Sequence, residues 1–181
     1  VFDLVFAPTT PVRDRENTIT ATLWNTGLAD AATDVTFYEG DPLTGTAIAT
    51  VRVTIPAGGA REASVTWIPT VGGPMIVTAV LHNGSATDTE PSNDELAKQT
   101  LVNIAPVALA GGDREGDWNA PIAFDGGASS DEDGLISTYR WDFGDGQASG
   151  YKTATYAYPM PGVYTATLTV TDNRGASSLD T

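Results

Sequence analysis

The residues best suited to chemistry in this chain lie in the run Asp131-Glu132-Asp133-Gly134. Aspartates at alternate positions, followed by a glycine that permits a sharp turn, let two carboxylates and an intervening carbonyl approach one hard cation. Asp and Gly also dominate ordinary exposed turns, so the run by itself fits a turn without a ligand equally well. Its meaning depends on the other oxygen atoms that the fold brings beside it.

Catalytic arrangements have little support in the sequence. His82 is the single histidine, and no serine has the sequence context of a nucleophile, so an acyl-transfer triad has no basis. A paired-carboxylate hydrolase needs two acidic side chains facing each other across a cleft, whereas the acidic residues here gather in predicted turns. The absence of cysteine excludes disulfides and thiolate zinc sites. We therefore expect no enzymatic activity.

The charge balance limits the classes of partner. The chain has 181 residues, with 23 acidic and 9 basic side chains and a formal net charge of −14. Binding to nucleic acid or to anionic lipid depends on clustered Lys and Arg, which this chain lacks. It also has no long apolar run, so we expect no membrane insertion. Cations and neutral polymers such as polysaccharide are the partners that the composition favours.

The elements that must position these side chains are strands. Apolar and polar residues alternate with period two, as in Thr18 to Leu23 and Val163 to Val170, and turn clusters such as Gly144-Asp145-Gly146 separate the runs. No segment has a helical stripe. A strand pattern ends at Ile104, and the Pro106 segment then starts a new one. The sequence therefore predicts two antiparallel sandwiches, residues 1–104 and 105–181.

The second half resembles the PKD (polycystic-kidney-disease-type) domain. The resemblance is carried by Pro106-Val107-Ala108, the segment Ser129 to Ile136, the core Trp141-Asp142-Phe143-Gly144-Asp145-Gly146 and the strand Gly162 to Asp172. It implies an Ig-like β-sandwich. The family ends with a further alternating strand, whereas only Ala176 to Thr181 follow here, so we expect an incomplete last strand and an exposed sheet edge.

The first half resembles the CARDB type (cell-adhesion-related domain of bacteria). The segments that match this family are Asp3-Leu4-Val5, the segment Ile19 to Gly27, the strand Arg61 to Pro69 and the acidic run Asp88 to Glu95. Both resemblances together imply an all-β fold of two tandem Ig-like or fibronectin-III-like antiparallel β-sandwiches. They also imply a non-catalytic role and an extracellular or cell-surface location.

The Ig-like topology gives the acidic run a context. In such a sandwich, the start of the first strand, the loop between the second and third strands and the loop after the sixth strand lie at one end. We therefore predict a Ca²⁺ site formed by Asp131, Asp133 and Asp172, completed by oxygens of Asn103 or Asp113. The ion would neutralise mutually repelling carboxylates and stiffen the joint between the domains. The alternative is a set of three solvated turns.

The tryptophans and one asparagine complete the candidate residues. Trp141 is expected in the core, as are Trp24 and Trp67 in the first domain. Trp118 lies in a polar loop, where it could stack on a sugar or dock a neighbouring subunit, unless it folds over the sandwich edge. Asn83-Gly84-Ser85 fits an N-glycosylation acceptor in a predicted turn.

Two functions remain in view. The first is a structural or adhesive surface protein, such as a surface-layer component, adhesin or filament subunit. It would contact other copies of itself or neighbouring surface-protein domains, and the strand Val1 to Phe6 could add to a sheet edge of the next copy. The alternative is a carbohydrate-binding or spacer module attached to a secreted hydrolase.

Overall fold

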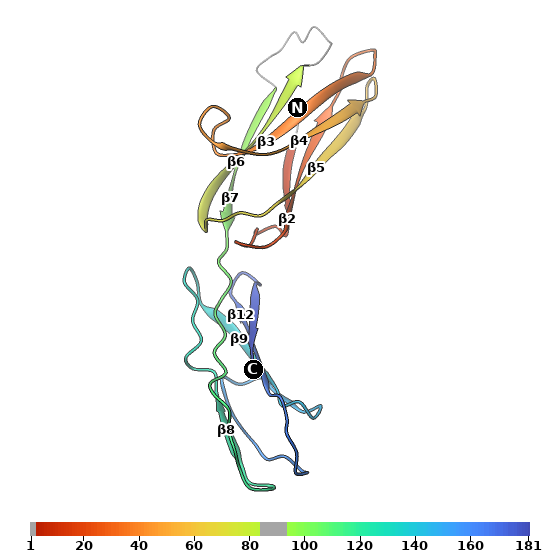
Figure 1. Ribbon diagram of the computed structural model, residues 1–181. Helices are drawn as coiled ribbons and strands as arrows, with labels where there is room; N and C mark the ends of the chain where they lie inside the picture. The colour runs from red at the N-terminus through yellow and green to blue at the C-terminus, as the bar shows by residue number, and fades with distance from the viewer. Residues whose placement is uncertain (1–2, 84–93) are drawn as a thin grey trace. The chain divides into compact units, whose positions relative to one another are not determined.

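The chain folds into two compact units, Val1–Asn103 and Ile104–Thr181 (Figure 1). The computed structural model describes residues 3–83 and 94–181. In this described part all regular elements are strands, which confirms the all-β prediction. The same residues contain no helix that is long and apolar enough to cross a bilayer. The division between the units falls one residue before the boundary expected from the sequence.

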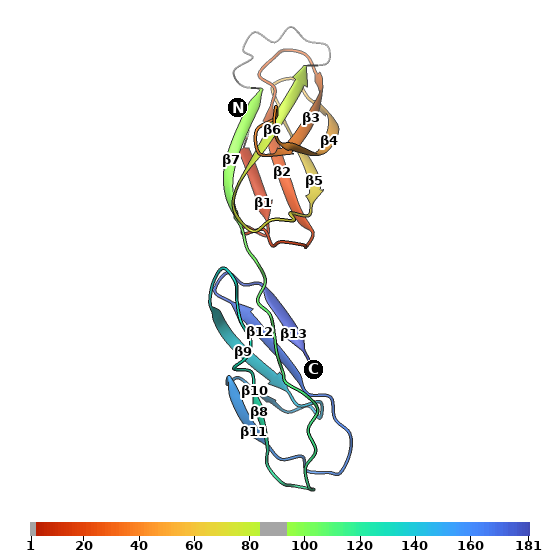
Figure 2. The same cartoon turned by 60° about the vertical axis from the view of Figure 1, so that its left-hand side comes forward.

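The first unit is a sandwich of two antiparallel sheets (Figure 2). One sheet has the strand order β1-β2-β5 and the other the order β4-β3-β6-β7. The strands are β1 (Asp3–Ala7), β2 (Asn17–Trp24), β3 (Ala31–Glu39), β4 (Thr46–Ile55), β5 (Ala60–Trp67), β6 (Gly73–Asn83) and β7 (Glu95–Val102).

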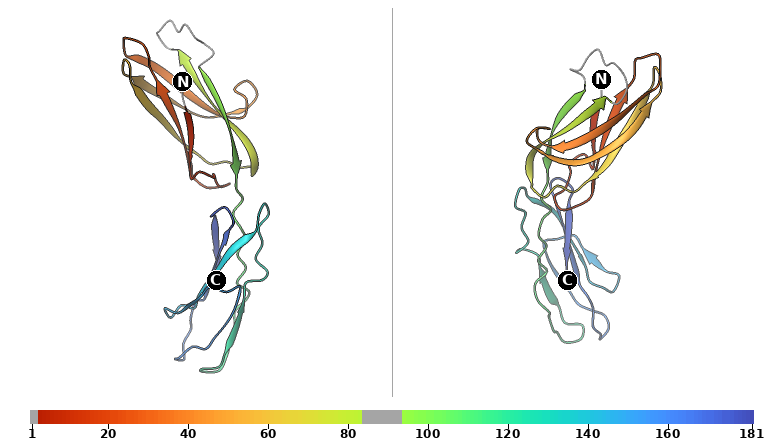
Figure 3. Two further views of the ribbon diagram at one scale, coloured as in Figure 1. Left: turned by 180° about the vertical axis from the view of Figure 1, so that it is seen from behind. Right: turned by 45° about the horizontal axis from the view of Figure 1, so that its top comes forward.

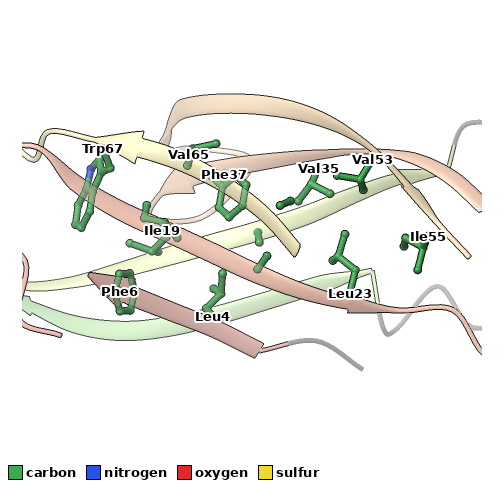
Figure 4. Packing of buried hydrophobic residues seen from close by; sticks show 14 of the residues in the cluster. Leu4, Phe6, Ile19, Leu23, Val35, Phe37, Val53, Ile55, Val65 and Trp67 are labelled. Atoms are coloured by element: carbon green, nitrogen blue, oxygen red, sulfur yellow. The ribbon is translucent and has the colours of Figure 1, made fainter. Parts of the chain in front are cut away.

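Strict alternation builds the core of this unit (Figure 4). Along β2, Ile19, Ala21 and Leu23 are buried while the intervening threonines face away from the core. Phe37 and Val35 of β3 meet them from the opposite sheet. Each large apolar side chain buried in this way contributes about 1.5–3 kcal/mol to folding.

The first strand is used inside its own unit. Five residues of β1 pair with β2, and Leu4 and Phe6 are buried in the core. On the other side of β1, the ammonium group of Lys98 in β7 donates a hydrogen bond to the Leu4 carbonyl oxygen and lies 3.4 Å from the Asp3 carboxylate. A lysine at a sheet edge discourages pairing with a further strand. β1 is therefore an edge strand that belongs to the sandwich of its own unit.

The tryptophans of this unit have opposite environments. Trp67 is buried, and its indole N–H donates a hydrogen bond of 2.5 Å to the Glu39 carboxylate. Trp24, in contrast, is 63% exposed, so the expectation that it lies in the core is wrong. The reason is strand parity, because Leu23 points inward and the next residue must point outward.

The second unit has a four-stranded sheet, β10-β9-β12-β13, and a two-stranded sheet, β11-β8; Figure 2 labels these strands, and Figure 3 shows the same ribbon from two further sides. The strands are β8 (Ile122–Asp125), β9 (Ile136–Asp142), β10 (Ala148–Ser149), β11 (Thr153–Tyr156), β12 (Thr167–Asp172) and β13 (Ser177–Asp180). Trp141 is fully buried, as expected, and its ring centroid lies 5.3 Å from that of Phe124 in the facing sheet. Leu168 and Val170 complete the centre of this core.

The last strand is short but paired. All four residues of β13 pair with β12. The other side of β13 faces the segment that opens the unit, which is held through side chains rather than a backbone ladder. The Ala108 N–H donates to Ser178 Oγ (3.1 Å), Ser178 Oγ donates to the Pro106 carbonyl (2.5 Å) and the Ala110 N–H donates to Asp180 Oδ2 (2.7 Å). This edge therefore has bonded neighbours on both sides.

Candidate cation site

Two turns of the second unit form the candidate site. The first, around Asp131 and Asp133, leads into β9, and the second follows Asp172 at the end of β12. Because β9 and β12 are antiparallel neighbours, the start of one strand lies beside the end of the other. Reciprocal hydrogen bonds join the turns: the Asn173 N–H donates to the Leu135 carbonyl (2.9 Å), and the Leu135 N–H donates to Asn173 Oδ1 (3.1 Å).

The Asp131 carboxylate has fewer recorded hydrogen bonds and ion pairs than those of Asp133 and Asp172. Both of its carboxylate oxygens are buried, and no group in the described residues meets the geometry of a hydrogen bond to them. Burial raises the pKa of the Asp131 carboxyl. The Asp133 backbone N–H lowers this pKa in part, and the neighbouring Asp133 and Asp172 carboxylates raise it again. A buried anion is costly for a folded protein unless hydrogen bonds or a positive charge compensate it.

The other two carboxylates already have partners. Asp133 Oδ2 forms a 3.0 Å ion pair with the Arg174 guanidinium, which also donates to the Asp133 carbonyl at 2.8 Å. Asp133 Oδ1 accepts the Ile104 N–H at 3.3 Å. Asp172 is buried, and its Oδ1 accepts the N–H groups of Arg174 (2.8 Å) and Ala176 (2.9 Å). Asp172 therefore shapes the β12–β13 turn, while Arg174 supplies a cation from within the chain.

Two oxygen atoms of the site lie close to Gly134. A Cβ at this glycine would lie 2.4 Å from Asn173 Oδ1 and 2.5 Å from Asp131 Oδ2, which is closer than a carbon atom can approach an oxygen atom without a bond. The same Cβ would lie 3.3 Å from Arg174 Nη1. A side chain at this position would therefore displace both oxygens, which gather beside the Gly134 backbone because glycine has no Cβ. In the part of the chain that the structure describes, no three acidic or histidine side chains are placed to hold a metal by themselves.

The site thus combines residues foreseen from the sequence with two that were not. The structure brings Asp131, Asp133 and Asp172 into electrostatic contact. The sequence predicts only that Asn173 and Arg174 belong to a turn. Nothing in it indicates that their side chains turn toward Asp131 and Asp133.

The two residues expected to complete the site, Asn103 and Asp113, differ in their surroundings. Asn103 belongs to the first unit, where its N–H donates to the Pro11 carbonyl at 2.8 Å and its carbonyl accepts the Arg13 N–H at 2.8 Å. Asp113 is exposed, at the end of a segment that runs along β13 from Ser178 toward Asp180, and therefore away from the turn after β12. The structure does not group Asp113 with the three carboxylates.

The remaining candidates are Trp118 and the triplet Asn83-Gly84-Ser85. Trp118 is 69% exposed, and its indole N–H donates to the Pro159 carbonyl at 3.3 Å. Asn83 is the last residue of β6, while Gly84 and Ser85 lie outside the described residues. Most of the acidic run Asp88 to Glu95 also lies outside them.

The two sandwiches define a tandem of Ig-like modules. A family model described as CARDB matches residues 2–98, and one described as PKD domain matches residues 103–181. The chain therefore belongs to the CARDB family over its first unit and continues as a PKD domain, which confirms both resemblances.

The relatives of this chain include proteases. Collagenase ColA of Clostridium perfringens is 42% identical over 96 residues, which are 53% of this chain and 8% of the collagenase. The pre-pro-metalloprotease PrtV of Vibrio cholerae is 45% identical over 82 residues, which are 45% of this chain and 8% of that protein. The match is thus a small part of each relative.

Two solved structures are also similar. The PKD1 domain of the Vibrio cholerae metalloprotease is 40% identical with a TM-score of 0.38, and the match covers 42% of this chain and 90% of that domain. The CARDB domain of a Pyrococcus furiosus protein is 15% identical with a TM-score of 0.46, and the match covers 56% of this chain and 87% of that domain.

Proposed function

We propose that this chain is a non-catalytic accessory module of a hydrolase that acts outside the cell on a polymer. The observation that carries the proposal is the identity of 42% to a collagenase and of 45% to a metalloprotease over about half of the chain. Because each match spans 8% of the relative, a catalytic domain would lie in another part of such a protein. The module would position that domain on its substrate or hold it at a distance.

The features of the chain agree with a non-catalytic role. The ring of His82, the single histidine, is hydrogen-bonded to Thr36 Oγ1 at 2.9 Å on the outer face of a sheet. Among residues 3–83 and 94–181, the structure records no third group that would make this pair a catalytic triad. The relatives favour this alternative over a self-associating surface subunit, and β1 is already paired within its own unit.

The calcium site is a second part of the proposal. Asp131, Asp133 and Asp172 would hold the ion together with the side-chain oxygen of Asn173, and Arg174 would release Asp133. Calcium would supply the positive charge that the buried Asp131 lacks and would tie together the two turns beside β9 and β12. The support is the buried Asp131 carboxylate and the nearness of its Oδ2 atom and of Asn173 Oδ1 to one another beside Gly134.

Two experiments test these proposals. Co-sedimentation of the full chain with insoluble collagen, chitin and cellulose should show retention on one polymer. No retention on any polymer, together with large assemblies in gel filtration, would contradict the accessory role and favour a self-associating protein.

For the ion, calorimetric titration of Ca²⁺ into chelator-treated protein should give a saturable heat that Asp131→Asn abolishes. Absence of heat and of a thermal shift at millimolar Ca²⁺ would rule the site out.

A further inference from the structure

A hollow of about 480 Å³ lies on the second unit, away from the acidic turns. Two segments form it: the hairpin turn between β9 and β10, and the end of β11 with the loop that follows. The residues that line it are Asp145, Gln147, Tyr156, Pro159, Met160 and Tyr164. It contains one carboxylate and no basic side chain.

The aromatic wall of the hollow is fixed by stacking. The ring of Tyr156 lies parallel to that of the buried Phe143, with centroids 4.2 Å apart. Tyr158 meets Tyr156 edge-on at 5.0 Å, and Tyr164 stacks on Tyr158 at 4.1 Å. Because this row of rings is anchored on a core residue, the rings are already in place before any ligand arrives.

The hydroxyl groups of these tyrosines all donate to acceptors within the protein. Tyr156 donates to Asp145 Oδ2 (2.6 Å), Tyr158 to the Phe143 carbonyl (2.9 Å) and Tyr164 to the Met160 carbonyl (2.9 Å). A phenol has one proton to donate, so these groups can offer a ligand only lone pairs and ring faces. Among the lining side chains, the Gln147 amide is the remaining donor.

The carboxylate keeps capacity for a ligand. Asp145 Oδ1 accepts the Gln147 N–H at 3.1 Å and Oδ2 accepts the Tyr156 hydroxyl, whereas a carboxylate can accept about four hydrogen bonds. Its hydrogen bond holds the wall in place and is the main cause that raises the pKa of Tyr156 to about 12. The hollow is therefore rich in acceptors, poor in donors and negative.

We propose that this hollow binds the side chain of an arginine or lysine from an extended polypeptide partner. These side chains carry donors and no acceptor, which complements the hollow, and their cations are attracted to tyrosine faces within about 6 Å. A sugar would need donors as well as acceptors from the protein. The exposed Trp118, hydrogen-bonded to Pro159 at the rim, gives the neighbouring residues of the polypeptide a surface to pack on. The inference does not depend on a link to a hydrolase.

The test uses the full chain and a capped Gly/Ser peptide with one arginine, titrated to about 10 mM at physiological salt, where long-range attraction is screened. Backbone amide NMR shifts report the binding. The same peptide with citrulline, which is neutral and nearly identical in shape, is the ligand control. The variant is Asp145→Asn, and its matched control is Asp125→Asn, because Asp125 caps a turn in the same way through the Gly127 N–H (2.8 Å) but lies outside the hollow.

We expect the arginine peptide to shift the amides of Asp145 and Gln147, and the citrulline peptide to leave them in place. Asp145→Asn should weaken binding by at least about tenfold, whereas Asp125→Asn should retain it. Met160→Lys, at an exposed rim position, should weaken binding similarly without altering the fold. The proposal would be overturned if both peptides shifted the amides equally or if neither shifted them. It would also be overturned if both Asp variants lost binding equally, or if neutral oligosaccharides caused the shifts instead.

Discussion

The substitution Asp131→Asn should stabilise the protein when calcium is absent. In the folded state the pKa of Asp131 is raised above its ordinary value of 3.8, because of burial first and the neighbouring carboxylates next. A raised pKa means that the folded state favours the protonated acid. That stabilisation is complete below pH 3.8 and is lost as the pH rises through the folded pKa, so at neutral pH the ionised Asp131 destabilises the fold. Asparagine has nearly the same shape without the charge.

The size of the effect follows from the burial of the two oxygens. A buried polar group without a partner costs about 1–3 kcal/mol, and partial solvent screening in this surface turn places the expected gain near the lower end, at about 1 kcal/mol. For a unit of this size, about 1 kcal/mol corresponds to a rise of about 4–8 °C in the unfolding midpoint. If calcium binds the wild type, saturation at 100 times the dissociation constant would add about 2.7 kcal/mol to the wild type alone.

The assay is thermal unfolding of wild type and variant, each with a chelator and with excess Ca²⁺. In the chelator the variant should melt at the higher temperature, and this order should reverse in Ca²⁺. Near pH 3, where the wild-type acid is largely protonated, the two curves should converge. Asp113→Asn is the matched control, because it makes the same change at an exposed position.

Two results would refute this reasoning. If Asp131→Asn melts at or below the wild-type temperature in the chelator, the carboxylate is not under electrostatic strain. If Ca²⁺ stabilises the variant as much as the wild type, Asp131 is not a ligand.

Three further outcomes are expected. Gly144→Ala should destabilise the second unit by more than Gly146→Ala: both have positive φ, but a Cβ at Gly144 would lie 2.5 Å from a backbone oxygen while Gly146 has open space, and chemical denaturation measures the difference. Alkaline unfolding should set in between pH 10 and about 12, since the stabilisation from the raised Tyr156 pKa is present below pH 10 and lost as the pH passes 12; Tyr156→Phe should remove this step in a circular-dichroism titration. Phe37→Ala should cost the first unit about 3–5 kcal/mol by leaving a cavity, and an unchanged urea midpoint would contradict its place in the core.

Much of the fold could be read from local pattern. The alternation in β2 predicted which residues are buried, because side chains of a strand point to opposite faces in turn. The same rule, applied one residue further, places Trp24 outside. The analogy with the core tryptophan of Ig-like sandwiches favoured the core, but the alternation along the strand decided its position. The motif around Trp141 likewise predicted a buried tryptophan and an Ig-like second half.

The candidate sites were predictable only in part. The sequence by itself determined strands, parity, two modules and an acidic turn near Asp131, since these depend on neighbours along the chain. Only the tertiary structure decided that Arg174 pairs with Asp133 and that Tyr156 donates to Asp145. The physical reason is that such contacts depend on strand register and on how turns from distant segments meet, and neither leaves a periodic signal in the sequence.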